Sequence, residues 1–137
     1  MFTGIIQDIA TLTKLEGGLF NVQTNLDLSN CKEGSSISCN GVCLTATNIS
    51  KNKKSYNFKV NIGEETLKRT NLDNCATNKK KINIEKSLTI GSEIGGHFVY
   101  GHVDATTTLI KIKNLDNSWE YFFKKDFDID NKFIIEK

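Results

Sequence analysis

The 137-residue chain contains no proline, and its four cysteines form no Cys-x-x-Cys pair. Because the sequence is rich in Asn, Ile and Lys, the absence of proline indicates a coding bias rather than a particular fold. Without closely spaced cysteine pairs, the thiols are expected to be free and reduced, as in a cytoplasmic protein. No apolar run approaches the roughly 18 residues of a membrane span. The net charge of +2 is too small to indicate a nucleic-acid or membrane partner.

The strongest internal signal is a repeat between the start of the chain and its last third. Phe2–Leu12 (FTGIIQDIATL) matches Val99–Leu109 (VYGHVDATTTL) at a constant offset of 97 residues, so that Gly4 falls on Gly101. A repeat this long corresponds to a small domain used twice, not to a solenoid module of about 20 to 50 residues. The chain is long enough for one such domain and roughly a third of another. We therefore expect a complete first domain at 1–95 and an incomplete second one at 96–137.

Short segments rich in Val, Ile, Thr and Phe predict an all-β domain. Asn40-Gly41 predicts a tight hairpin, because both residues tolerate a positive φ. Acidic residues followed by basic ones predict one short helix at Glu64–Arg69. The predicted strands are Phe2–Leu12, Leu19–Thr24, Ser36–Cys39, Cys43–Ile49, Tyr56–Asn61 and Lys81–Glu85. Together they indicate a six-stranded Greek-key barrel with a short helix, followed by the start of a second, similar barrel.

Two segments carry candidate chemistry. Cys43 and Thr45 are two residues apart, which places both on one face of a strand; they are equally compatible with a small buried thiol and an ordinary strand threonine. His97 and His102 are the only histidines and lie among glycines that would let the backbone approach a ligand. Two histidines at this spacing do not make a metal site, so no metal is expected.

Five segments, in the same order along the chain, resemble the riboflavin synthase family of lumazine-binding proteins. They are MFTGII, GSSISCNGVCLT, ETLKRTNL, NIEKSL and GGHFVYGHVDA. The resemblance implies two Greek-key barrels per chain and no metal or external cofactor. It also implies a reaction in which two molecules of 6,7-dimethyl-8-ribityllumazine exchange a four-carbon unit, yielding riboflavin and 5-amino-6-ribitylaminouracil.

The resemblance further implies site residues and partners. In the family the active site lies between the first barrel of one subunit and the second barrel of its neighbour, so a homo-oligomer is expected: a trimer as in the family, or a dimer that pairs first barrels. His102, Cys43 and Ser36 match positions tied to activity. Substrate-binding positions fall on Gly4, Ile5, Ile6, Cys43, Leu44, Thr45, Asn61, Ile62, Gly63, Glu64, Glu65, Thr66, Gly101, His102, Val103 and Lys137.

The two copies differ at a position that matters for this chemistry. In the repeat Ile5 corresponds to His102, so one pocket is apolar where the other carries an imidazole suited to moving protons. We expect His102 to assist proton transfer at the C7 methyl group of the donor. Cys43 or Ser36 is expected to assist or position the nucleophile that adds to the acceptor.

Two alternatives remain open. One is a non-catalytic lumazine or flavin carrier of the same family. His102, Cys43 and Ser36 favour the enzyme, because a carrier needs no proton shuttle, and the incomplete second copy favours the carrier. A small barrel that binds nucleic acid needs aromatic residues interleaved with basic ones along a positive stripe. Only residues 56–59 and 121–125 come near that pattern, so nucleic acid is not an expected partner.

Overall fold

The computed structural model describes residues 1–124, and these form two compact units. The first is Met1–Val103 and the second begins at Asp104. Residues 96–103, which the sequence analysis groups with the second copy, therefore lie in the first unit. Its elements are β1 Asp8–Lys14, β2 Leu19–Thr24, β3 Ser36–Cys39, β4 Val42–Thr45, β5 Thr47–Asn52, β6 Ser55–Asn61, α1 Glu64–Arg69, α2 Leu72–Thr77 and β7 Lys81–Lys86.

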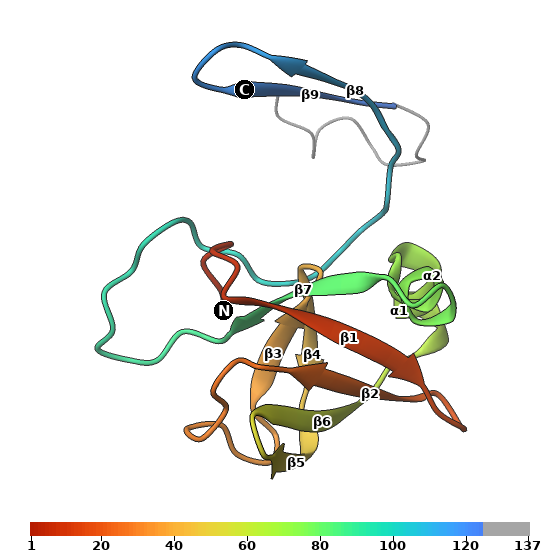
Figure 1. Ribbon diagram of the computed structural model, residues 1–137, viewed down its shortest axis with the longest axis vertical. Coiled ribbons are helices and arrows are strands. Elements are labelled where there is room, and N and C mark those ends of the chain that lie inside the picture. The colour runs from red at the N-terminus through yellow and green to blue at the C-terminus, as the bar shows by residue number, and fades with distance from the viewer. Residues whose placement is uncertain (125–137) are drawn as a thin grey trace. The chain divides into compact units, whose positions relative to one another are not determined.

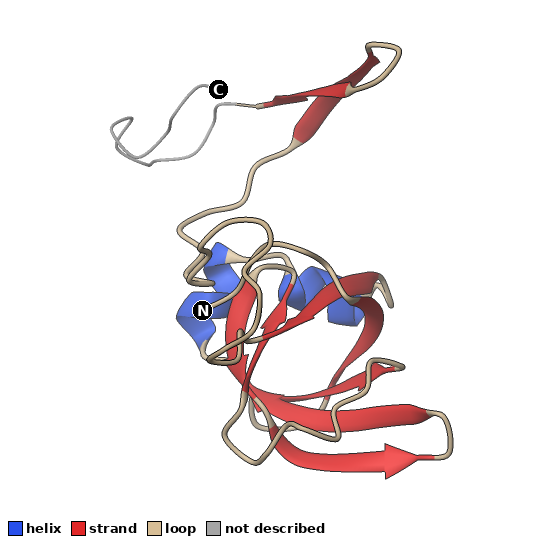
Figure 2. Ribbon diagram, turned by 90° about the vertical axis from the view of Figure 1, so that its left-hand side faces the viewer, coloured by secondary structure: helices blue, strands red, loops and turns tan. Residues whose placement is uncertain are grey.

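The seven strands of this unit form one curled antiparallel sheet in the order β4-β3-β7-β1-β2-β6-β5 (Figure 1). The two ends of this order, β4 and β5, are consecutive in the chain and separated only by Ala46. Counted as one bent strand, they make six strands whose sheet curls back on itself (Figure 2). The prediction of an all-β Greek-key fold is confirmed.

The bend at Ala46 is fixed by hydrogen bonds to the preceding turn. The Ala46 amide donates to the Ser35 carbonyl at 2.8 Å, and its carbonyl accepts from Gly34 at 2.9 Å. The alanine is fully buried, so both backbone groups need these partners. The single strand predicted at Cys43–Ile49 is therefore wrong: tertiary hydrogen bonding divides it into two strands.

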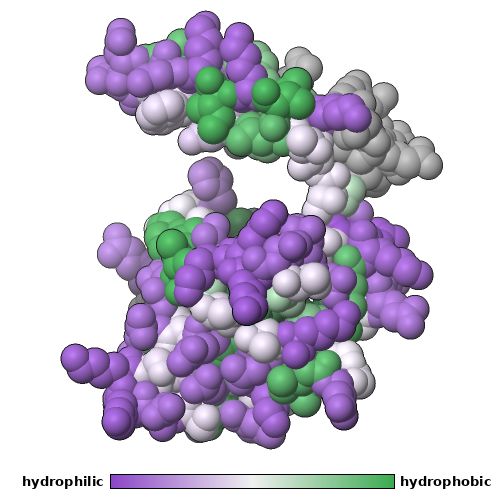
Figure 3. Space-filling view, turned by 45° about the vertical axis from the view of Figure 1, so that its right-hand side comes forward, coloured by the Kyte–Doolittle hydropathy of each residue, from purple (hydrophilic) through white to green (hydrophobic). Residues whose placement is uncertain are grey.

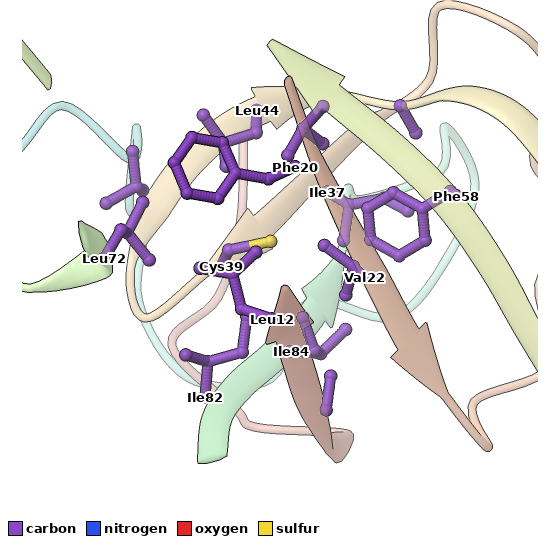
Figure 4. Close-up of a cluster of buried hydrophobic side chains, with 14 of the residues drawn as sticks. Leu12, Phe20, Val22, Ile37, Cys39, Leu44, Phe58, Leu72, Ile82 and Ile84 are labelled. Atoms are coloured by element: carbon purple, nitrogen blue, oxygen red, sulfur yellow. The ribbon is translucent and has the colours of Figure 1, made fainter. Parts of the chain in front are cut away.

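The core fills the inside of the curl. Buried side chains alternate along the long central strands, as Phe20 and Val22 do on β2 and Phe58 and Val60 do on β6. Figure 4 shows the rings of Phe20 and Phe58 among aliphatic side chains from the surrounding strands. Removing either ring would cost about 3–5 kcal/mol, so this cluster is a main source of stability.

The helical region is larger than the sequence indicates. The helix predicted at Glu64–Arg69 is confirmed, and a second one, α2, follows directly. Leu72 and Cys75 of α2 are buried in the core, although its other residues are mostly polar. Both helices have six residues, far too few to cross a bilayer, and no other helix occurs within residues 1–124.

The second unit contains one antiparallel hairpin, β8 Leu109–Asn114 with β9 Trp119–Phe123. All residues of both strands are exposed, including Ile110 and Trp119. Figure 3 shows a group of hydrophobic side chains on this hairpin. The interpretation of the hairpin as the start of a second barrel remains a prediction.

Acid should destabilise the first unit through Asp8. Burial raises the pKa of Asp8, but hydrogen bonds from Thr24, Asn25 and Leu26, together with a backbone bond at Ile9, outweigh it and leave the pKa lowered. A carboxyl with a lowered folded-state pKa stabilises the fold above its unfolded pKa, about 4, and loses that contribution as pH falls through the folded pKa.

We expect the free energy of unfolding to decrease as the pH is lowered below about 4. Asp8→Asn should make this decrease shallower and should lower the Tm at neutral pH, because it removes the carboxylate that accepts the hydrogen bonds. Urea unfolding between pH 2.5 and 7 measures both effects. An acid limb that is unchanged in Asp8→Asn would contradict the assignment to Asp8.

Candidate ligand-binding site

Residues Met1–Gln7, here called the N-terminal strap, lie beside the end of β7 and the residues that follow it. Phe2–Leu12 was predicted as one strand, but β1 starts only at Asp8, and the strap joins the sheet through separate contacts. The Gln7 amide donates to Ile84 at 2.9 Å, and the Met1 carbonyl accepts from Leu88 at 3.0 Å. The strap contains the predicted ligand positions Gly4, Ile5 and Ile6, all of which are exposed.

The strap is held on its other side by residues 95–103, here called the linker. Phe2 and Val99 exchange both backbone hydrogen bonds, at 2.7 and 3.0 Å, and the His97 amide donates to the Thr3 carbonyl at 2.9 Å. A Cβ added at Gly96 would lie 2.6 Å from the Thr3 carbonyl oxygen. The glycines around the histidines were predicted to admit a ligand; the close neighbour at Gly96 is instead the chain's own strap.

The linker continues to β4. The Cys43 amide donates to the Gly101 carbonyl at 2.9 Å, and a Cβ at Gly101 would lie 2.7 Å from Cys43 Cβ. Gly101 is buried, with φ of +82°, and Val103 packs against the core. Two predicted ligand segments, 43–45 and 101–103, are thus in direct contact within the first unit.

Strand β4 places Cys43 and Thr45 on one face, as their two-residue spacing predicts. Val42 and Leu44 point into the core, while Cys43 is half-buried and Thr45 is exposed. On the neighbouring strand Ser36 lies directly opposite Thr45. The outer face therefore carries the hydroxyl groups of Ser36 and Thr45 and the Cys43 thiol within one hairpin, with the buried Ser38 opposite Cys43.

The third predicted segment, Asn61–Thr66, connects β6 to α1. Strand β6 contacts β4 across the curl, which brings this connection near the same hairpin. Ile62 is buried, and its amide donates to the Gly18 carbonyl at 3.0 Å. Asn61, Gly63, Glu64 and Glu65 are exposed, and Thr66 is half-buried. Exposed polar groups here could reach a ligand bound against β4.

The three predicted catalytic residues are brought into one region but are not joined to one another. His102 follows Gly101, whose carbonyl accepts a hydrogen bond from the Cys43 amide, and Ser36 lies two register positions from the Ser38–Cys43 pair. No side-chain hydrogen bond links the three within residues 1–124. His102 is exposed. The predicted ligand residue Lys137 lies outside the described residues.

A hollow lined by strap residues and by residues 85–95 lies elsewhere on the first unit. It has a volume of about 410 Å³, and its wall is formed mainly by hydroxyl, amide and charged groups. Among the predicted site residues within 1–124, Ile5 alone lines it; Thr3, Glu85 and Lys86 contribute polar groups. The direct β4–linker contact, not this hollow, unites the predicted ligand segments.

The thiols differ in their surroundings. Cys39 is fully buried beside Cys43, and burial raises its pKa to about 12, so it stays a neutral thiol. Burial also raises the pKa of Cys31. All four cysteines are free, and no cluster of three or more His, Cys, Asp or Glu occurs in the described part of the chain. Cys39 and Cys31 are thus unsuited to act as thiolates.

One residue important for the strap was missed by the sequence analysis. Glu85 is only 4% exposed and accepts hydrogen bonds from Thr3 and Gly4. In β7 Ile82 and Ile84 point into the core, so the alternation of side chains along a strand predicts that the next residue, Glu85, faces solvent. Nothing local in the sequence signals the strap that covers it.

Comparison with known proteins gives matches over most of the chain. The sequence profile of the family described as Lumazine binding domain matches residues 3–87. Riboflavin synthase from Brucella abortus (strain 2308) is 39% identical over 83% of this chain and 58% of its own length. Riboflavin synthase from Bacillus subtilis (strain 168) is 34% identical over 99% of this chain and 63% of its own length. The chain therefore spans about three fifths of these relatives.

Solved structures support the fold. LumP complexed with 6,7-dimethyl-8-(1'-D-ribityl) lumazine aligns with a TM-score of 0.69 at 20% identity, covering 93% of this chain and 71% of that one. LumP complexed with riboflavin aligns with the same TM-score, covering 94% and 70%.

Gly101→Ala should disrupt the contact between the linker and β4. The new methyl group would meet Cys43 at 2.7 Å in addition to the strain of the positive φ. Gly34→Ala is the matched control, because Gly34 has φ of +88° and nothing within 4 Å of the added Cβ. We expect Gly34→Ala to cost about 1–2 kcal/mol of backbone strain and Gly101→Ala distinctly more. Equal losses in urea unfolding would contradict a steric role for this contact.

Proposed function

Because the chain belongs to the lumazine binding domain family, we propose that its first unit binds 6,7-dimethyl-8-ribityllumazine as the first barrel of a riboflavin synthase. The observation that carries the proposal is the Cys43–Gly101 hydrogen bond, which joins two segments, far apart in the sequence, that the family resemblance predicts to bind ligand. The riboflavin synthase relatives and the LumP complexes support the same ligand class.

The ligand would lie against the outer face of β4. Thr45 and Thr66 offer hydroxyl groups for the ring or ribityl oxygens, and backbone groups beside Gly4, Gly63 and Gly101 can read the polar edge of the pyrimidine ring. The half-buried Cys43 supplies adjoining apolar surface on the same face, whereas the side chain of Leu44 points into the core. These groups complement a lumazine, which has a flat ring, a polar edge and a polyol chain.

The proposed reaction is the transfer of a four-carbon unit between two lumazine molecules, a transferase activity. One molecule gains the carbons and becomes riboflavin, and the other becomes 5-amino-6-ribitylaminouracil. His102 accepts a proton from the C7 methyl group of the donor, which generates the carbanion needed for carbon–carbon bond formation. Cys43 or Ser36 positions the nucleophile at the acceptor.

A non-catalytic lumazine or flavin carrier is the second candidate. One observation supports it: the chain shares its fold with LumP, of which complexes with 6,7-dimethyl-8-(1'-D-ribityl) lumazine and with riboflavin are known. A complete reaction site needs two ligands face to face, whereas a carrier needs one pocket. For either function we propose a homo-oligomer in the cytoplasm, trimeric as in the family or a dimer, and the free thiols support a reducing compartment.

Fluorescence titration with 6,7-dimethyl-8-ribityllumazine tests the binding proposal. We expect saturable binding, weakened about tenfold by Thr45→Val, because that change removes a hydroxyl group but keeps the volume of the side chain. Thr13→Val, on the exposed part of β1, is the control and should bind like the wild type. An absence of saturable binding by the wild-type chain would overturn the proposed function.

His102→Gln separates the enzyme from the carrier. If His102 moves a proton, the substitution should lower the rate of riboflavin formation by about 10²–10⁴-fold while changing lumazine affinity much less. Riboflavin production is followed by its absorbance, and affinity by fluorescence. Binding without product in the wild type would favour the carrier, and equal losses of rate and affinity would count against a catalytic histidine.

A further inference from the structure

Glu85 joins the strap to the sheet through an unusually complete set of hydrogen bonds. Its Oε1 accepts from the Thr3 amide at 2.6 Å and from Thr3 Oγ1 at 2.7 Å, and its Oε2 accepts from the Gly4 amide at 3.1 Å. Thr3 Oγ1 in turn accepts from the Ile5 amide at 3.1 Å. Three consecutive amides of the strap thus turn toward one carboxylate, directly or through a hydroxyl group.

The geometry of the strap requires this arrangement. Gly4 has φ of +81°, a left-handed conformation that glycine adopts without steric cost, so the chain can turn at this position beside the carboxylate. A carboxylate 4% exposed must be matched by strong donors, because an unpaired buried charge is costly. Glu85 belongs to β7, a central strand paired on both sides with β1 and β3, so its position is rigid.

The strap is therefore fixed from two sides. Glu85 holds Thr3 and Gly4 from the sheet, and the linker holds Phe2 and Thr3 through Val99 and His97. The linker leads directly to Gly101, which binds Cys43 on β4. A shift of the strap would be transmitted through the linker to the predicted ligand segment 101–103.

We propose that Glu85 is a positioning residue for the ligand site, setting the strap residues Gly4 and Ile5 and, through the linker, the backbone at Gly101. Glu85 itself does not touch the ligand. The proposal rests on the proposed lumazine-binding function and assigns a role to a residue outside the predicted site.

Glu85→Gln tests this role with little change in shape. The amide nitrogen of glutamine is a donor and would face the donors of Thr3 or Gly4, so part of the arrangement must open. We expect lumazine affinity to fall about tenfold or more, and the Thr3 and Gly4 amides to exchange faster with solvent in the ligand-free protein. Thr3→Val removes only the hydroxyl group and should give a smaller loss; it carries the test if Glu85→Gln does not fold.

Asp8→Asn is the matched control. Asp8 Oδ2 also accepts from one hydroxyl and two amides, those of Thr24, Asn25 and Leu26, but these belong to the end of β2 and the start of the β2–β3 connection. We expect Asp8→Asn to lower the Tm while leaving lumazine affinity within about twofold.

Hydrogen exchange and fluorescence titration on the same four proteins decide the question. Faster exchange at Gly4 together with a selective loss of affinity in Glu85→Gln supports the proposal. Faster exchange with unchanged affinity, or equal affinity losses in Glu85→Gln and Asp8→Asn, would overturn it although wild-type binding stands. A wild type that does not bind lumazine would overturn the proposed function itself, and the positioning role with it.

Discussion

The fold depends on burying one face of a seven-stranded sheet that has no second sheet packed against it within residues 1–124. The sheet solves this by curling, so that Phe20, Phe58 and their neighbours fill its own interior. The curl becomes continuous because β4 and β5, the two edges of the strand order, are joined through the single buried residue Ala46. Exposed strand edges, which invite pairing with other chains, are thereby reduced in the first unit.

The candidate site uses what the curl leaves outside. The outward side chains of β4 are not packed in the core and are available to contact a ligand, whereas the inward side chains are not. Two irregular segments, the strap and the linker, cover the neighbouring surface and are held by backbone hydrogen bonds and one buried carboxylate. Because these contacts are polar and directional, they fix the position of the backbone more narrowly than apolar packing alone does.

Much of this architecture could be predicted from local sequence, and the remainder could not for identifiable reasons. Leu19–Thr24, Ser36–Cys39 and Glu64–Arg69 were predicted with the bounds that the structure shows, because alternation, the Asn-Gly turn and end charges act locally. The break at Ala46 was missed because Thr-Ala-Thr is a good strand sequence and the interruption comes from residues 34–35. Helix α2 was missed because its residues are mostly polar and only Leu72 and Cys75 are buried. The family resemblance supplied the site residues; neither it nor the pattern of β7 indicated Glu85.

The pairing of Phe2 with Val99 has an evolutionary consequence. In the predicted repeat Val99 is the equivalent of Phe2, and the two residues exchange both backbone hydrogen bonds, with Gly4 and Gly101 at nearly the same φ, +81° and +82°. A residue that pairs with its own equivalent is the signature of an isologous two-fold contact. The same contact, made between two separate single-barrel chains, would form a symmetric dimer. A gene duplication that fused such chains would preserve this contact and free each half to acquire its own polar groups, as at Ile5 and His102.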